Sequence, residues 1–132
     1  MLIKYDIEIP IYGGILAILI TDMDVYIHDH YDDLGECNLI EYAHATYVNI
    51  KKGKQFRRAY LIAFNINNKY AKITHGTIGH EAVHSAQIIL ESIGMKLKKN
   101  SSEAYAYLAQ WIIDRVYELF EKNKIKIYLK PK

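Results

Sequence analysis

Short stretches of alternating or continuous apolar residues fill the first half of the chain and predict β-strands. Apolar and polar residues alternate from residue 2 to residue 8, as in a strand with one buried face. Gly13 and Gly14 predict a turn, and the almost unbroken apolar run that follows is typical of a strand buried on both faces. The predicted strands cover residues 2–8, 15–21, 42–51 and 58–66, the last two joined by a polar hairpin turn.

In the second half of the chain, the apolar residues recur at intervals of three and four, which predicts amphipathic helices. The first helix is predicted between Thr77 and Gly94. Thr74 or Thr77 can cap its start, and Gly94 can close its end. Its apolar row contains Ile78, Ala82, Val83, Ala86, Ile89, Leu90 and Ile93.

A second helix is predicted to follow the capping residues 100–102 and to end near Asn123. Its apolar row consists of Leu108, Ile112, Val116 and Leu119. Because the link between the two helices is short, at residues 95–100, we expect them to form a hairpin.

Two segments have less decisive patterns. Asp22 can cap a helix over residues 22–35, but part of this segment is equally compatible with extended chain. We favour the helix, and the sequence leaves the conformation of residues 22–38 open. Lysines alternate with apolar residues at 124–130, which predicts a short last strand with one solvated face, as at a protected sheet edge.

Strands followed by two helices and a short strand predict an α+β fold. We expect a small, mostly antiparallel sheet with both helices packed on one face. The 132 residues suffice for one real core, and no linker or repeat divides them. Residues 1–132 are therefore expected to form a single domain.

Composition and charge narrow the class of protein. The chain is 51% hydrophobic and 24% charged, as in an ordinary soluble globule, and its net charge of +2 does not indicate a polyanionic partner. The basic residues around the turn at 51–58 favour a solvated turn over a nucleic-acid site, because no nucleic-acid motif accompanies them. No apolar run is long enough for a membrane span or a secretory signal, and the single Cys37 fits a reducing compartment. We expect a cytoplasmic protein without a membrane partner.

The candidate chemistry lies in the first predicted helix, in the motif His80-Glu81-Ala82-Val83-His84. Residues four apart on a helix share a face, so His80 and His84 can hold one metal ion between two imidazoles. Glu81 can then act as general base toward a metal-activated water. Such ligands suit several divalent ions, of which zinc (Zn2+) is the one that this motif indicates.

A catalytic zinc site needs a third ligand, and Glu103 is the candidate. It follows His84 after eighteen residues, in the first turn of the second predicted helix. In a helical hairpin this carboxylate can return over the first helix, although an acid near a helix N-terminus is also favoured by the helix dipole alone. Tyr107 lies one turn later on the same face and is the candidate donor to the substrate oxyanion; the alternative for Tyr107 is a packing role.

An HExxH motif followed after eighteen residues by Glu resembles the gluzincin class of zincin metallopeptidases. Most of the chain is similar to a small group of phage- and prophage-encoded proteins described only as predicted metallopeptidases. The matching stretches are residues 9–14, 76–84 and 103–108. The resemblance implies that His80, His84 and Glu103 are zinc ligands and that Glu81 is the catalytic base. The substrate-amine motif of the large aminopeptidases of that class has no counterpart here, so their specificity does not carry over.

We therefore expect a minimal zincin-like, zinc-dependent metallopeptidase that hydrolyses a peptide or another amide. In zincins the strand before the metal helix borders the cleft and pairs with an extended substrate, which by resemblance assigns this role to the strand from Arg58 to Ile66. An open sheet edge can bind a peptide in this way. The alternative is a non-catalytic zinc-binding structural or interaction protein that retains the site, because the chain is short for a peptidase. Neither the substrate nor the oligomeric state follows from the sequence.

Overall fold

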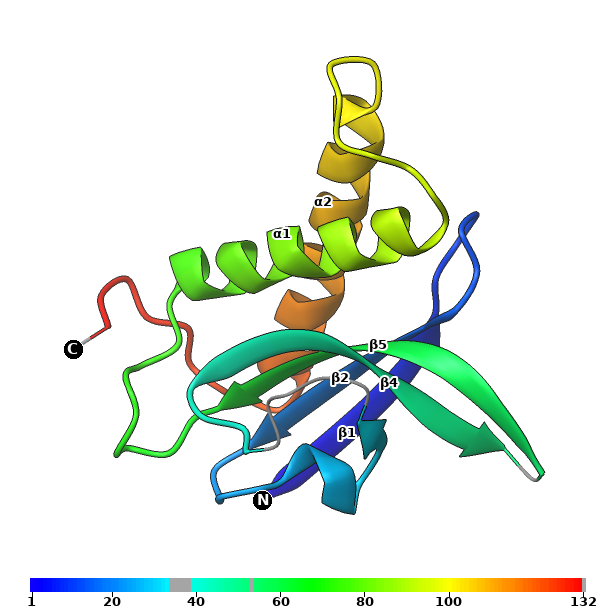
Figure 1. Cartoon of the computed structure of the whole chain (residues 1–132). Helices are drawn as coiled ribbons and strands as arrows, with labels where there is room; N and C mark the ends of the chain where they lie inside the picture. Colours follow the sequence, from blue (N-terminus) through cyan, green and yellow to red (C-terminus); the bar gives the residue numbers. More distant parts are fainter. Residues whose placement is uncertain (34–38, 53, 132) are drawn as a thin grey trace.

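Figure 1 shows a twisted β-sheet with two helices packed on one face, an α+β fold as predicted. The structure is a computed structural model and describes residues 1–33, 39–52 and 54–131. Its elements are β1 (Leu2–Glu8), β2 (Ile15–Thr21), the 3-10 helix η1 (Ile27–Asp29), β3 (Asp32–Asp33), β4 (Ala43–Lys52), β5 (Gln55–Asn65), α1 (His75–Ser92) and α2 (Ser102–Lys122). The four predicted strands and both predicted helices are confirmed, with ends shifted by a few residues in β4, β5 and the helices.

The strands β2 and β5 form the centre of the sheet, whose order is β1-β2-β5-β4-β3. These two strands pair in parallel, with Ile18 opposite Ile62, whereas the other neighbours in the described sheet pair antiparallel. The prediction of a mostly antiparallel sheet is therefore confirmed. Because β2 has a strand on each side and is covered on both faces, all seven of its residues are buried, which explains its apolar sequence.

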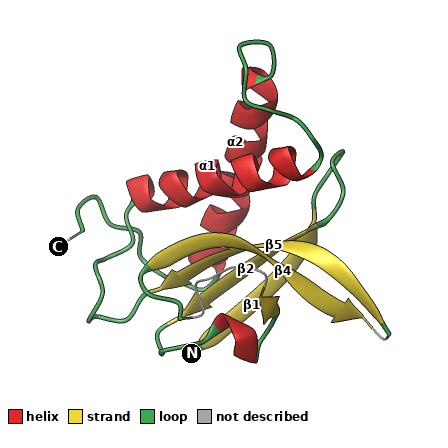
Figure 2. Ribbon diagram, in the orientation of Figure 1, coloured by secondary structure: helices red, strands yellow, loops and turns green. Residues whose placement is uncertain are grey.

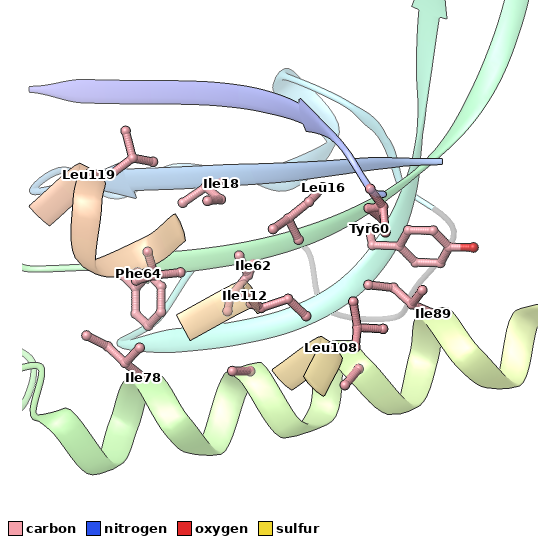
Figure 3. Close-up of a cluster of buried hydrophobic side chains, with 14 of the residues drawn as sticks. Leu16, Ile18, Tyr60, Ile62, Phe64, Ile78, Ile89, Leu108, Ile112 and Leu119 are labelled. Atoms are coloured by element: carbon pink, nitrogen blue, oxygen red, sulfur yellow. The ribbon is translucent and has the colours of Figure 1, made fainter. Parts of the chain in front are cut away.

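Side chains on the helix-facing side of the sheet form the main core (Figure 3). In β5, Phe64 packs edge-on against Phe120 of α2, with ring centroids 5.5 Å apart. Burial of each large aliphatic side chain stabilises the fold by roughly 1.5–3 kcal/mol relative to exposure, so this cluster holds both helices to the sheet. Its other members include Leu16 and Ile18 of β2, Ile62 of β5, Ile78 and Ile89 of α1, and Leu108, Ile112 and Leu119 of α2.

The opposite face of the sheet is covered by the chain between β2 and β4. Val25 and Ile27 are buried against this face, and Tyr26 between them is exposed. This spacing of two suits extended chain, so the predicted helix over residues 22–35 is wrong in its described part, where only η1 and β3 form. Residues 34–38 lie outside the described residues.

The ends of α1 are fixed by caps. The Thr74 hydroxyl accepts a hydrogen bond from the Thr77 backbone N–H at 3.1 Å, and the Thr77 hydroxyl accepts one from the Thr74 backbone N–H at 3.2 Å. This capping box satisfies two N–H groups at the helix start and confirms Thr74 as the cap. At the other end, Gly94 has φ +84° and donates its N–H to the Glu91 carbonyl, a conformation that glycine adopts without strain.

The segment after α2 does not form the predicted strand at residues 124–130. Among the described residues of this segment, only Tyr128 makes a β-bridge, in parallel with Thr74, beside the chain that enters α1. Ile125 and Ile127 are half-buried against the main core. The alternating pattern therefore reflects packing of one face on the core and not pairing at a sheet edge.

Figure 2 shows that α2 crosses α1 steeply, so the predicted helical hairpin is not formed. The linker at residues 93–101 carries the chain beyond α1, and α2 then runs back toward the sheet with its first turn projecting past α1 (Figure 1). The buried Tyr105 holds this arrangement by donating its hydroxyl to the Met95 carbonyl at 2.7 Å. Within the described chain, neither helix combines the length and the apolar composition that crossing a membrane requires.

Candidate functional site

His80 and His84 lie side by side on adjacent turns of α1. Their Nε2 atoms are 3.1 Å apart, and their ring centroids are 4.7 Å apart. Both side chains are exposed and lie opposite the buried row that includes Ile78, Ala82 and Ile89. The helical spacing of the motif therefore produces the imidazole pair that the sequence predicts.

The separation of the two Nε2 atoms is compatible with one tetrahedral zinc ion. Zinc–nitrogen bonds of about 2.0–2.1 Å place two tetrahedral nitrogen ligands about 3.3–3.4 Å apart. The observed 3.1 Å requires only a small rotation of the rings to reach this value. His80 and His84 can therefore hold a metal ion, with the remaining coordination positions facing solvent because both rings are exposed.

Glu81 has a mostly buried side chain, whose carboxylate makes no contact with another polar group of the described chain and whose oxygens are not fully buried. Its side chain is 9% exposed, and it makes no hydrogen bond or ion pair with another residue in the described chain. One turn later, the buried Ser85 hydroxyl also lacks a partner among the described residues. Burying the Ser85 hydroxyl without a hydrogen bond costs free energy. The Glu81 carboxylate differs, because its oxygens are not fully buried and can accept a hydrogen bond from a molecule at the surface.

Glu81 and His80 border a shallow pocket of about 440 Å³, which is also lined by Tyr42, Gly76 and Thr77. The pocket lies where the start of β4 meets the first turns of α1. The carboxylate of Glu81 is thus available to a molecule in this pocket, next to the imidazole pair. A carboxylate, one imidazole of the histidine pair and a tyrosine line this one pocket, and His84 lies one turn beyond His80 on the same helix.

Tyr42 is a site residue that the sequence did not reveal. Its hydroxyl lies 2.5 Å from the Thr77 hydroxyl and donates a 3.3 Å hydrogen bond to the Lys72 carbonyl. Its φ of +51° is in the left-handed region, which costs a non-glycine residue roughly 1–2 kcal/mol. Strained residues of this kind concentrate at functional sites. No local pattern links Tyr42 to His80, because their proximity arises only when α1 packs along β4.

Glu103 and Tyr107 lie on the exposed side of α2 and do not join the histidines. Tyr107 is 67% exposed, and both residues lie opposite the buried row of Tyr105, Leu108 and Ile112. Within the described residues, no group of three or more His, Cys, Asp or Glu side chains is arranged to hold a metal ion. Because the helices cross, the first turn of α2 is not carried back over α1. The structure therefore supports neither Glu103 as third ligand nor Tyr107 as a donor in the pocket.

The strand predicted to bind substrate has no open edge. The segment from Arg58 to Asn65 belongs to β5, and from Ala59 onward it pairs with β2 on one side and with β4 on the other, so the described sheet leaves no free edge there. In β4, by contrast, the outer edge at residues 43–47 pairs with no strand in the described chain, because β3 reaches only Val48 and Asn49. This edge begins directly after Tyr42 and the pocket.

The site therefore combines an exposed imidazole pair with a pocket lined by His80, the mostly buried side chain of Glu81 and the strained Tyr42. No family model, curated protein or solved structure matches this chain. Its function must consequently be inferred from the geometry and chemistry of these side chains.

Proposed function

We propose that the protein is a metal-dependent hydrolase that cleaves a peptide bond or another amide. The observation that carries this proposal is the carboxylate of Glu81, which makes no hydrogen bond or ion pair in the described chain and borders the same pocket as His80. General-base catalysis requires such an acceptor within reach of the water whose proton it removes.

His80 and His84 would hold the ion, and zinc is the ion that best suits them in this motif. A bound zinc ion would act as a Lewis acid and lower the pKa of a water molecule. Glu81 would accept a proton from water in the pocket and pass it to the leaving amine. With the two ligands that the described chain supplies, the site would bind zinc more weakly than a site with three.

Tyr42 takes the donor role that the sequence assigned to Tyr107. Its 3.3 Å hydrogen bond to the Lys72 carbonyl is long, so a substrate oxygen can compete for the hydroxyl proton. A donor directed at the carbonyl oxygen stabilises the negative charge that develops there during amide hydrolysis.

An extended peptide would pair with the outer edge of β4 at residues 43–47. Backbone hydrogen bonds to an open strand edge bind a peptide without strict sequence preference, and side chains beside the edge supply selectivity. A peptide on this edge would pass Tyr42 and the pocket that contains Glu81.

The test is a comparison of wild type with Glu81→Gln after purification without added metal. We expect close to one zinc ion per chain in both proteins and peptide cleavage only in wild type, with a loss of about 10²–10⁴-fold in the variant. Glu91→Gln changes an exposed carboxylate of the same helix and should cleave like wild type. A zinc-loaded wild type that cleaves no peptide in a broad library would refute the proposal, as would full activity in Glu81→Gln.

A second candidate is a zinc-binding interaction protein without hydrolytic activity. It is favoured by the exposure of both imidazoles and by the lack of a third ligand in the described chain. An exposed histidine pair can share a zinc ion with ligands from another molecule, which completes the tetrahedron. Zinc-dependent association in sedimentation experiments, lost in His84→Ala and accompanied by no cleavage, would favour this candidate over the hydrolase.

A further inference from the structure

A second pocket, of about 560 Å³, lies between the loop that connects β5 to α1 and the segment that follows α2. The loop contributes Lys69 and Lys72 to its lining, and the segment contributes Lys126 and Tyr128. Its volume lies within the range of small-molecule sites, about 300–1,000 Å³. The proposed hydrolytic site uses none of these four side chains, so this pocket is separate from it.

Main-chain hydrogen bonds hold the two walls of this pocket together. The Lys72 N–H donates to the Pro131 carbonyl at 3.0 Å, and the Tyr128 N–H donates to the Ile73 carbonyl at 3.0 Å. The His75 N–H donates to the Tyr128 carbonyl at 3.3 Å. The pocket is therefore preformed, so a ligand would not have to order its walls on binding.

Two of the three lysines that line this pocket, Lys72 and Lys126, form no ion pair with an acid of the described chain. The ammonium groups of Lys72 and Lys126 lie 4.4 Å and 4.8 Å from the centre of one ring, that of Tyr128. Within the described chain neither ammonium group makes an ion pair or a hydrogen bond, and no Asp or Glu lines the pocket. Lys69 differs, because its ammonium group lies 2.5 Å from Asp24. Because both cations lie within 5 Å of one ring centre, they repel each other, and an anion bound beside this ring would stabilise them.

Apolar surface lies beside these charges. Ile73 is buried at the base of the loop, and Ile125, Tyr128 and Pro131 line the opposite wall. Small-molecule sites typically combine such an apolar lining with a few polar groups that orient the ligand. We propose that this pocket binds an organic anion, whose carboxylate or phosphate group contacts Lys72 and Lys126 and whose apolar part packs against Tyr128.

The first experiment is an NMR titration of the full chain with phenyl phosphate and with phenylacetate, following the lysine ε-methylene and tyrosine ring signals. We expect saturable shifts at this pocket with at least one of the two, and the tighter probe identifies the anionic group. Benzyl alcohol lacks the charge and inorganic phosphate lacks the apolar group, so both should bind more weakly. If neither organic anion gives saturable shifts, or if inorganic phosphate binds as tightly as phenyl phosphate, the proposal is wrong.

The second experiment assigns the binding to the named side chains. Lys72→Gln and Lys126→Gln should each weaken the tighter probe about ten-fold, the order expected for one charge-assisted contact. Lys122→Gln removes an exposed charge at the end of α2 and should bind like wild type. Amide spectra of each variant verify the fold, and Tyr128→Leu tests the ring separately. Unchanged affinity in the Lys72→Gln/Lys126→Gln double variant, or an equal loss in Lys122→Gln, would overturn the proposal.

Discussion

The hydroxyl of Tyr42 lies 2.5 Å from the hydroxyl of Thr77, so one hydrogen bond joins the start of β4 to the first turn of α1. Thr77 also takes part in the capping box of that helix. Tyr42 and Thr77 both border the pocket that contains Glu81. The start of the helix and the wall of the pocket therefore form one hydrogen-bonded unit.

Tyr42→Phe keeps the ring and removes the hydroxyl. The hydroxyl makes two hydrogen bonds, each usually contributing about 0.5–1.5 kcal/mol, so we expect the free energy of unfolding to fall by about 1–3 kcal/mol and peptide cleavage to fall with it. Urea denaturation and a cleavage assay measure the two effects. Tyr107→Phe is the matched control, because this side chain is 67% exposed, and it should change neither quantity. Equal effects of the two variants would contradict a special role of Tyr42.

Glu81→Gln should change the stability of the metal-free protein by no more than about 0.5 kcal/mol. The Glu81 side chain makes no hydrogen bond or ion pair in the described chain and its carboxylate oxygens are not fully buried, so the isosteric amide loses no contact. Urea denaturation measures the free energy of unfolding, with the exposed Glu91→Gln as control. A loss of more than about 1 kcal/mol would mean that the carboxylate already has a partner in the fold.

Zinc affinity distinguishes the ligand set predicted from sequence from the pair found in the structure. His80→Ala and His84→Ala should each lower the affinity about ten-fold or more, because each removes one ligand bond. Glu103→Gln should leave the affinity unchanged, since Glu103 does not form a metal-binding group with the histidines. Competition with a chromophoric chelator measures all three. A large loss of zinc affinity in Glu103→Gln would show that Glu103 is the third ligand, as the sequence predicts.

The ion pair between Asp24 and Lys69 predicts a pH dependence of stability. The hydrogen bond from the Lys69 ammonium group holds the pKa of the Asp24 carboxyl below its ordinary value of 3.8. Because the pKa is lower in the folded state, this contribution is complete above pH 3.8 and is lost as the pH falls through the folded-state pKa. Asp24→Asn should therefore lose less stability than wild type on acidification, as measured by urea denaturation across this range.

The effect of this pair should be small and should shrink in high salt, because both side chains are about half exposed. Asp114→Asn changes an exposed acid on α2 and should follow the acid response of wild type. Identical acid responses of wild type and Asp24→Asn would show that the pair contributes nothing measurable.

The elements that the sequence predicted correctly are those whose pattern is local. The strand β2 is buried on both faces and is apolar almost throughout, and α1 carries its own caps at Thr74 and Gly94. The segment after α2 has the alternation of a strand, yet Ile125 and Ile127 pack on the core beside a loop. Alternation of apolar and polar residues indicates which side chains are buried. It does not determine whether the backbone forms hydrogen bonds with a neighbouring strand.

In the candidate site, too, the sequence predicts the local arrangement of residues but not the contacts between distant elements. His80 and His84 meet because they lie four positions apart on one helix, which the sequence specifies completely. Glu103 could have met them only if α2 ran back along α1, and the crossing of the two helices depends on how both pack on the sheet. Tyr42 could not be found for the same reason, because its place beside Glu81 is a tertiary contact.

The parallel pairing of β2 with β5 also determines the order in which the chain can fold. The hairpins β1–β2 and β4–β5 join strands that are close in sequence, so each can form early. The central pairing instead closes a loop of residues 22–54, and the entropy of that closure must be offset before the core consolidates. We expect two locally formed halves to dock late, with Ile18 and Ile62 meeting in the slow step and their mutation slowing refolding more than mutation of either turn.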